Sequence, residues 1–164
     1  MPIVIRILAV LALAGGLAGC FTSEKSLVGD KAVFPFETIV WKEDKGTEEV
    51  TMKREGDHYI FRPKEADSDG YLRFMPAGDL YVAELEFTEE GEVNHLYAIL
   101  KVDLTAKTVE AYASMAPNNF SEDGFTACEG GMCIDNLDAY VAYGKRLIDD
   151  GRPPDSVYRI ISTK

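Results

Sequence analysis

Turn-forming sequences recur along this chain at intervals of roughly ten residues, and this regularity limits the folds open to it. They fall at Lys45-Gly46, Glu55-Gly56-Asp57, Ser68-Asp69-Gly70, Ala77-Gly78-Asp79, Glu90-Gly91 and Leu104-Thr105-Ala106-Lys107. The runs between them are short and rich in β-branched and aromatic residues, which favour strands. Short strands joined by tight turns predict an antiparallel meander.

Two of these runs alternate between apolar and polar positions. In the first, Tyr81, Ala83, Leu85 and Phe87 share one face, while Glu84 and Glu86 share the other. In the second, Val109, Ala111 and Ala113 interleave with Glu110, Tyr112 and Ser114. Alternation with a period of two predicts a sheet with one buried face.

The run from Leu96 to Leu100 is apolar on both faces, so we expect it to be covered on both sides. A helix near the C-terminus can supply the outer cover, packing around Tyr97 and Ile99. Its apolar residues at helical spacing are Leu137, Tyr140, Val141, Gly144, Leu147 and Ile148. Asp135 or Asn136 stands at the N-cap position, and Gly151 with Pro153-Pro154 ends the helix. Residues 157–161 then predict one last strand.

The predicted fold is mainly β, with a meander of about seven strands that forms a small barrel or strongly curved sheet, followed by a helix and a final strand. Closure into a barrel removes exposed sheet edges. The order of elements resembles that of the lipocalin and calycin barrels. Those families carry Gly-x-Trp on the first strand, whereas Trp41 here follows Ile39-Val40. A half-open sheet with the helix on one face is the alternative.

The first twenty residues have the features of an export signal. Arg6 precedes an apolar run from Ile7 to Ala14, which is shorter than the roughly 20 residues of a membrane span. The segment after this run ends in Leu17-Ala18-Gly19-Cys20, which resembles the lipobox of bacterial lipoproteins. This resemblance implies that the chain is cut before Cys20 and that lipid is attached to the Cys20 thiol. Several acyl chains would hold the protein stably on a membrane.

The resemblance also implies a division of the chain and a location. Residues 1–19 would be the signal peptide, 20–31 the lipid anchor and tether, and 32–164 a single β-rich domain. Lipoproteins kept at the inner membrane carry Asp after the lipidated cysteine, whereas Phe21 stands here. We therefore expect a lipid-anchored protein of the bacterial envelope, on the outer membrane facing the periplasm.

The charge of the chain bears on its partners. The full chain has a net charge of −11, and residues 1–19 contain one base and no acid, so the mature chain is more acidic still. A protein this acidic is repelled by nucleic acid and attracts basic proteins. The expected partners are the membrane, through Cys20, and another envelope protein with a basic surface.

Two cysteines remain after Cys20, and both lie close together in the sequence. Cys128 and Cys133 form an even pair in an oxidising compartment, which predicts a disulfide. They end a long irregular loop that begins at Met115. Phe120 and Phe125 are the aromatic residues of this loop, and loops of this length are often functional. They are candidate partner contacts, or their rings plug one end of the barrel.

No arrangement of residues typical of catalysis occurs in the sequence. Neither His58 nor His95 has a metal-ligand partner two or four positions further on. No Gly-x-Ser-x-Gly, Walker or Gly-x-Gly-x-x-Gly motif occurs. We therefore expect no enzyme, no cofactor and no metal site.

Two functions agree with these features. The first is a protein-interaction or structural module held at the membrane. The second is a carrier of a small apolar ligand inside a calycin-like barrel, with space provided by Ala83, Ala98, Ala111 and Ala113.

Overall fold

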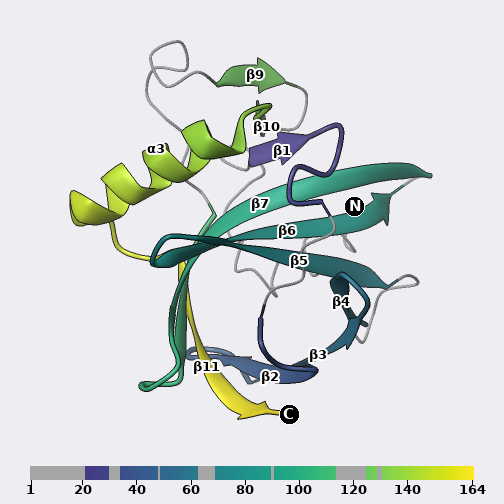
Figure 1. The fold of residues 1–164 in the computed structure, drawn as a ribbon, viewed down its shortest axis with the longest axis vertical. Coiled ribbons are helices and arrows are strands. Elements are labelled where there is room, and N and C mark those ends of the chain that lie inside the picture. The colour runs from purple at the N-terminus through teal and green to yellow at the C-terminus, as the bar shows by residue number, and fades with distance from the viewer. Residues whose placement is uncertain are drawn as a thin grey trace.

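The computed structural model describes residues 21–29, 34–47, 49–62, 69–89, 91–113, 125–128 and 131–164. Eight antiparallel strands close into a barrel (Figure 1). They are β2 (Thr38–Glu43), β3 (Glu49–Glu55), β4 (His58–Phe61), β5 (Gly70–Ala77), β6 (Leu80–Glu89), β7 (Glu92–Asp103), β8 (Thr108–Tyr112) and β11 (Ser156–Thr163).

The strand order confirms the predicted meander. β2 to β8 pair each with the next, and β11 then enters between β8 and β2, antiparallel to both. The pairing between β6 and β7 completes the ring. The fold is therefore a closed barrel and not the half-open sheet.

Apolar side chains, both large and small, line the barrel interior. Ala83, Leu85 and Phe87 of β6 point inward, as their alternation predicts, and so do Val109, Ala111 and Ala113 of the second alternating run. The ring of Phe34 also enters the interior, with its centroid 4.5 Å from that of Phe74 and 4.8 Å from that of Tyr81. The Tyr59 hydroxyl donates to the Phe34 carbonyl and so fixes this segment ahead of β2.

A second apolar cluster lies outside the barrel, beneath the helix α3 (Leu137–Asp149). β7 contributes side chains to both clusters. Its inward residues are Leu96, Ala98 and Leu100. Tyr97 and Ile99, on the other face of the strand, point toward α3. The Tyr97 and Tyr140 rings lie 6.2 Å apart. The prediction that the helix covers the outer face of this strand is confirmed.

The ends of α3 follow from its flanking residues. Asn136 is the N-cap, and its side chain accepts a hydrogen bond from the Ala139 N–H. Gly151 follows the helix with a φ of 88°, a conformation that glycine adopts without strain. None of the helices among the described residues is long and apolar enough to cross a membrane.

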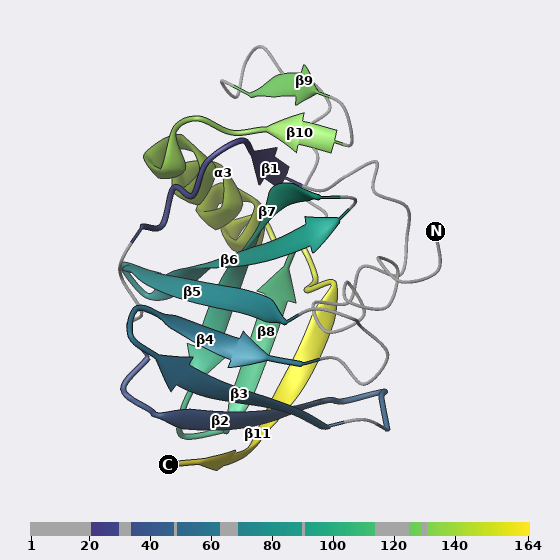
Figure 2. The same cartoon turned by 90° about the vertical axis from the view of Figure 1, so that its right-hand side faces the viewer.

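Three short strands extend the sheet away from the barrel, at the end opposite the C-terminus (Figure 2). They are β1 (Phe21–Ser23), β9 (Thr126–Cys128) and β10 (Gly131–Cys133). β1 pairs with the first half of β7 on one side and with β10 on the other. β9 and β10 are joined by the predicted Cys128–Cys133 disulfide, which is present.

The expectation that residues 20–31 form a tether does not hold for the part that the structure describes. Phe21 is fully buried and lies in the second cluster, with its ring 4.9 Å from that of Tyr140. Ser23 is hydrogen-bonded to the Tyr97 hydroxyl. The segment that follows Cys20 is thus part of the fold, because its backbone and its aromatic side chain both find partners there.

Phe125 is also placed differently from the prediction. Its ring is 5% exposed and packs edge-on against Phe21 and Tyr143, with centroids 5.2 and 5.3 Å away. It therefore neither offers a surface contact nor plugs the barrel, and it is Phe34 whose ring enters the barrel. Phe120 lies outside the described residues.

Candidate functional site

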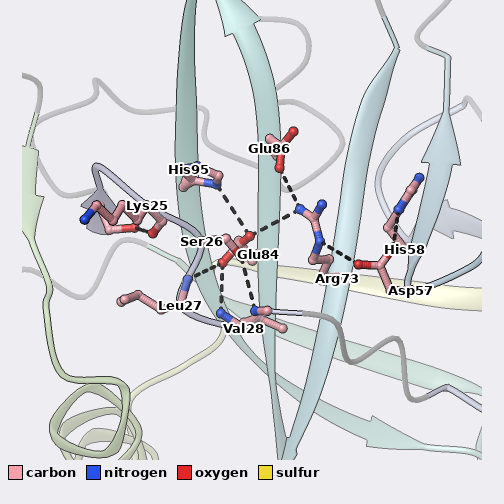
Figure 3. A network of polar contacts seen from close by, with 12 residues as sticks. Lys25, Ser26, Leu27, Val28, Asp57, His58, Arg73, Glu84, Glu86 and His95 are labelled. Atoms are coloured by element: carbon pink, nitrogen blue, oxygen red, sulfur yellow. Dashed lines mark hydrogen bonds and ion pairs between the residues drawn. The ribbon is translucent and has the colours of Figure 1, made fainter.

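Charged side chains gather on the outer face of the barrel (Figure 3). Most of them lie on β5, β6 and β7, and two more lie at the start of β4 or directly before it. The group, called here the β5–β7 charge network, consists of Asp57, His58, Arg73, Glu84, Glu86 and His95. It contains both histidines of the chain.

Strand register explains why these side chains meet. Arg73 on β5 is directly opposite Glu84 on β6, and Glu84 is directly opposite Tyr97 on β7. Glu86 is opposite His95 in the same way. Directly opposed residues on one face of a sheet lie within side-chain contact of each other.

Glu84 is fully buried, although it lies on the outer face of the barrel. Its Oε2 atom accepts hydrogen bonds from the Leu27 N–H at 2.9 Å, the Val28 N–H at 3.1 Å and the Tyr97 hydroxyl at 2.8 Å. The chain after β1 covers this carboxylate, and Glu84 in turn holds that chain on the barrel. Hydrogen bonds to a charged group typically contribute about 1.5–3 kcal/mol each.

The pKa values show which interactions prevail. Burial alone raises the pKa of Glu84, but hydrogen bonds from Ser26, Val28 and Tyr97, together with nearby His95, hold it below its usual value. Burial, reinforced by the charge of Glu84, raises the pKa of the Tyr97 hydroxyl far above its usual value. The network is therefore built around a carboxylate that stays ionised and a phenol that stays neutral.

Arg73 is the positive centre of the network. Its Nη1 atom lies 2.7 Å from Glu86 Oε2 and 3.4 Å from Glu84 Oε1, and its Nε atom lies 3.8 Å from Asp57 Oδ2. Burial opposes its charge, yet the three carboxylates outweigh burial and raise the pKa of the guanidinium. Three carboxylates thus face one guanidinium.

The two histidines lie on opposite sides of Arg73 and have different surroundings. His58 Nδ1 lies 2.7 Å from Asp57 Oδ1, and this hydrogen bond is the main reason that the pKa of Asp57 is lowered. The His95 side chain is only 7% exposed, and its Nδ1 atom lies 3.4 Å from Glu84 Oε1. Among the described residues this buried nitrogen has no hydrogen-bond partner of good geometry.

Chemically, the network can do two things. It binds the two backbone N–H groups of Leu27 and Val28 through a buried carboxylate, which fixes the N-terminal segment. It also presents an excess of negative charge that a cation can balance. His95, Glu84 and Glu86 each place one possible ligand atom within 4.8 Å of the others.

The residues singled out from the sequence lie elsewhere. Cys128 and Cys133 are joined beside Thr22, whose hydroxyl lies 3.6 Å from the Cys128 sulfur. Phe125 packs on Phe21 nearby. Cys20 lies outside the described residues. The disulfide and Phe125 therefore support β1, next to the network but not in it.

The network was not predicted from the sequence, although a signal for part of it was present. The connections of β5 to β6 and of β6 to β7 set the registers that oppose Arg73 with Glu84 and Glu86 with His95. Alternation also places Glu84 and Glu86 on the outer face. No local sequence pattern indicates that residues 25–28 fold over Glu84, or that Asp57 lies close to Arg73.

Comparison of the chain with protein-family models, with curated proteins and with solved structures finds no significant match.

Proposed function

We propose that this chain is a lipid-anchored protein of the bacterial envelope, attached through Cys20, whose barrel serves as a rigid interaction or structural module. The observation that carries the proposal is the fixing of the residues that directly follow Cys20. Phe21 is buried between α3 and the sheet, and Glu84 binds Leu27 and Val28. A lipid at Cys20 would thereby be joined firmly to the folded domain.

The short length of free chain after Cys20 supports a rigid attachment of the barrel to the membrane. An eleven-residue tether would reach up to about 40 Å, because each residue spans at most about 3.6 Å. With Phe21 in the core, a single peptide unit separates Cys20 from the folded domain. The barrel would then lie close to the membrane surface in a restricted range of orientations.

The negative net charge of the chain supports the proposal that its partner is a basic protein. The net charge of −11 gives long-range attraction to positively charged surfaces, and such attraction weakens as salt screens it. We therefore expect a partner complex that forms rapidly at low ionic strength and dissociates as salt is raised.

Lipid attachment is tested by growing bacteria that express the full chain with an alkyne-bearing palmitate and comparing it with Cys20→Ser. The full chain should take up the label and sediment with membranes, while Cys20→Ser should do neither. Equal membrane association of both proteins, without label, would exclude the anchor. Crosslinking in cells, followed by isolation at low and high salt, then tests for a basic partner.

A small-ligand carrier is a second candidate, favoured by one buried polar atom inside the barrel. Trp41 Nε1 has no hydrogen-bond partner among the described residues. The Trp41 and Tyr158 rings lie 5.8 Å apart in the interior cluster, and Ala83, Ala98 and Ala113 lie in the same cluster. Buried donors normally have partners, so a ligand with an acceptor group is one way to supply one for Trp41.

Trp41 is the only tryptophan of the chain and reports on this interior directly. Titration with medium-chain fatty acids should change its fluorescence if the barrel takes up such ligands. Ala98→Leu, which adds volume inside the barrel, should weaken the response, and Ala142→Leu on the exposed side of α3 should not. Unchanged fluorescence throughout the titration would argue against a carrier of fatty acids.

A further inference from the structure

The β5–β7 charge network contains three side chains whose positions fit a metal ion. Glu84 and Glu86 lie two residues apart on β6, and His95 is opposite Glu86 on β7. Their ligand atoms lie within 4.8 Å of one another, with Glu84 fully buried and His95 nearly so. We propose that Glu84, Glu86 and His95 bind a divalent transition-metal cation of the zinc type.

One nitrogen of the His95 ring is buried without a hydrogen-bond partner in the described part of the chain. This Nδ1 atom is directed at Glu84 Oε1, 3.4 Å away, without forming a hydrogen bond to it (Figure 3). Two ligands on a tetrahedral ion, each about 2.1 Å from it, are ~3.4 Å apart. The separation suits a shared metal better than a direct hydrogen bond.

The two oxygens of Glu84 have different partners. The N–H groups of Leu27 and Val28 and the hydroxyl of Tyr97 all bind Oε2. Oε1 accepts a long hydrogen bond from Arg73 Nη1 and lies 3.4 Å from His95 Nδ1. The bonds to Oε2 thus orient the carboxylate, as partners around metal sites do, and direct Oε1 toward the nitrogen of His95 with which it would share a metal.

The charges of the network also favour a bound cation. Asp57, Glu84 and Glu86 carry three negative charges against the one positive charge of Arg73. These four side chains together carry a net negative charge in a partly buried place, which a second cation reduces. Arg73 stays paired with Asp57 and Glu86, and its repulsion weakens the site. We expect a dissociation constant on the order of micromolar, far weaker than structural zinc.

The donor set selects the class of metal. One imidazole nitrogen and two carboxylate oxygens suit zinc and similar ions, and leave a fourth position for water. Calcium prefers six to eight oxygen ligands, which these three residues do not provide. Because Glu84 also holds residues 25–28, a bound metal would tighten the attachment of the N-terminal segment.

The experiment is calorimetric titration of the untagged full chain, in detergent, with zinc chloride. Cobalt chloride titrated separately should give the visible absorption of a tetrahedral nitrogen-oxygen site. We expect one ion per chain. His95→Gln and Glu86→Gln should each weaken zinc binding at least tenfold and abolish the cobalt spectrum.

His58→Gln is the matched control, because this histidine belongs to the same network but lies beyond Arg73, against Asp57. It should leave zinc affinity within about twofold of the unmodified chain. If His95→Gln fails to fold, Glu86→Gln still decides the question, because the Glu86 side chain is 24% exposed. Absence of binding up to millimolar zinc, or equal affinity in all variants, would overturn the proposal.

Discussion

At the scale of single residues, Glu84 illustrates how a buried carboxylate becomes tolerable. Burial of an unpaired charge costs several kcal/mol, but here backbone N–H groups, a phenol and a guanidinium surround the carboxylate. The donors come from segments that only the folded chain brings together. Glu84 is therefore both a stabilising residue and the link between the barrel and the N-terminal segment.

The Tyr97 hydroxyl joins Glu84 to this segment, so its removal should loosen the attachment. Tyr97→Phe removes contacts with Glu84 Oε2, the Leu27 N–H and the Ser23 hydroxyl. We expect a loss of about 1–3 kcal/mol in the free energy of unfolding, measured by urea denaturation in chelator-treated buffer. Tyr71→Phe, at a partly exposed tyrosine of β5, is the control and should cost less. Equal losses would contradict this role of the hydroxyl.

Tyr112 should make the protein sensitive to alkali. Burial first, then the hydrogen bond to Glu110 and the charges of Glu110 and Asp155, raise its pKa to about 12. The unfolded pKa is near 10, so the folded state favours the neutral phenol. This stabilisation is complete below about pH 10 and is lost as pH rises toward 12. Tyr112→Phe should flatten the fall of unfolding free energy over that window. An unchanged slope would show that Tyr112 does not contribute.

At the scale of elements, α3 and the strands β1, β9 and β10 form a second layer on one side of the barrel. The helix is defined by local signals, since its cap, apolar spacing and terminating glycine all stand in the sequence. β1 is different, because three residues cannot form a stable strand alone. It exists because β7 and β10 both pair with it.

The N-cap of α3 can be tested by comparing two adjacent residues. Asn136→Ala removes the side-chain acceptor for the Ala139 N–H and should lower the unfolding free energy by about 1 kcal/mol. Asp135→Ala, at the exposed preceding position, should have a smaller effect in the same thermal unfolding measurement. A larger loss at Asp135 would reassign the cap.

The disulfide should stabilise the second layer more than the barrel. It closes a short loop, for which the chain-entropy model gives roughly 2 kcal/mol. In Cys128→Ser with Cys133→Ser, we expect amide exchange to accelerate in β1, β9 and β10 while β3 to β6 keep their protection. Uniform acceleration across the chain would instead indicate a single cooperative unit.

At the scale of the whole molecule, the barrel and its second layer define two opposite ends. β1, β9 and β10 lie at one end, and the C-terminus lies at the other beside β2 and the end of β11 (Figures 1 and 2). On the proposed lipid attachment, the end with β1 faces the membrane and the C-terminal end faces away from it.

This orientation can be measured with fluorescent labels on the lipidated protein in phosphatidylcholine vesicles. A label at Ala142→Cys on α3 should be quenched by nitroxide headgroups more strongly than one at Ile161→Cys, which is 45% exposed on β11. A flexible ten-residue insert between Cys20 and Phe21 should reduce the difference. Equal quenching without the insert would rule out a fixed orientation.

The sequence by itself determined the meander, the inward residues of β6 and β8, the two-faced β7, the helix with its ends, the final strand and the disulfide. Each depends on contacts between neighbouring strands or on residues a few positions apart, so local periodicity and turn chemistry suffice. The closing pairs of β11 and the inward position of Phe34 did not follow from such patterns.

Only the tertiary structure determined where the N-terminal segment lies and which residues form the candidate site. Leu27 and Glu84 are 57 residues apart, and no periodic pattern encodes their meeting. The polar composition of residues 21–31 is typical of a tether, yet pairing with β7 and the burial of Phe21 outweigh it. Glu84 and His95 look like surface residues in the sequence, and they become buried because another part of the chain covers them.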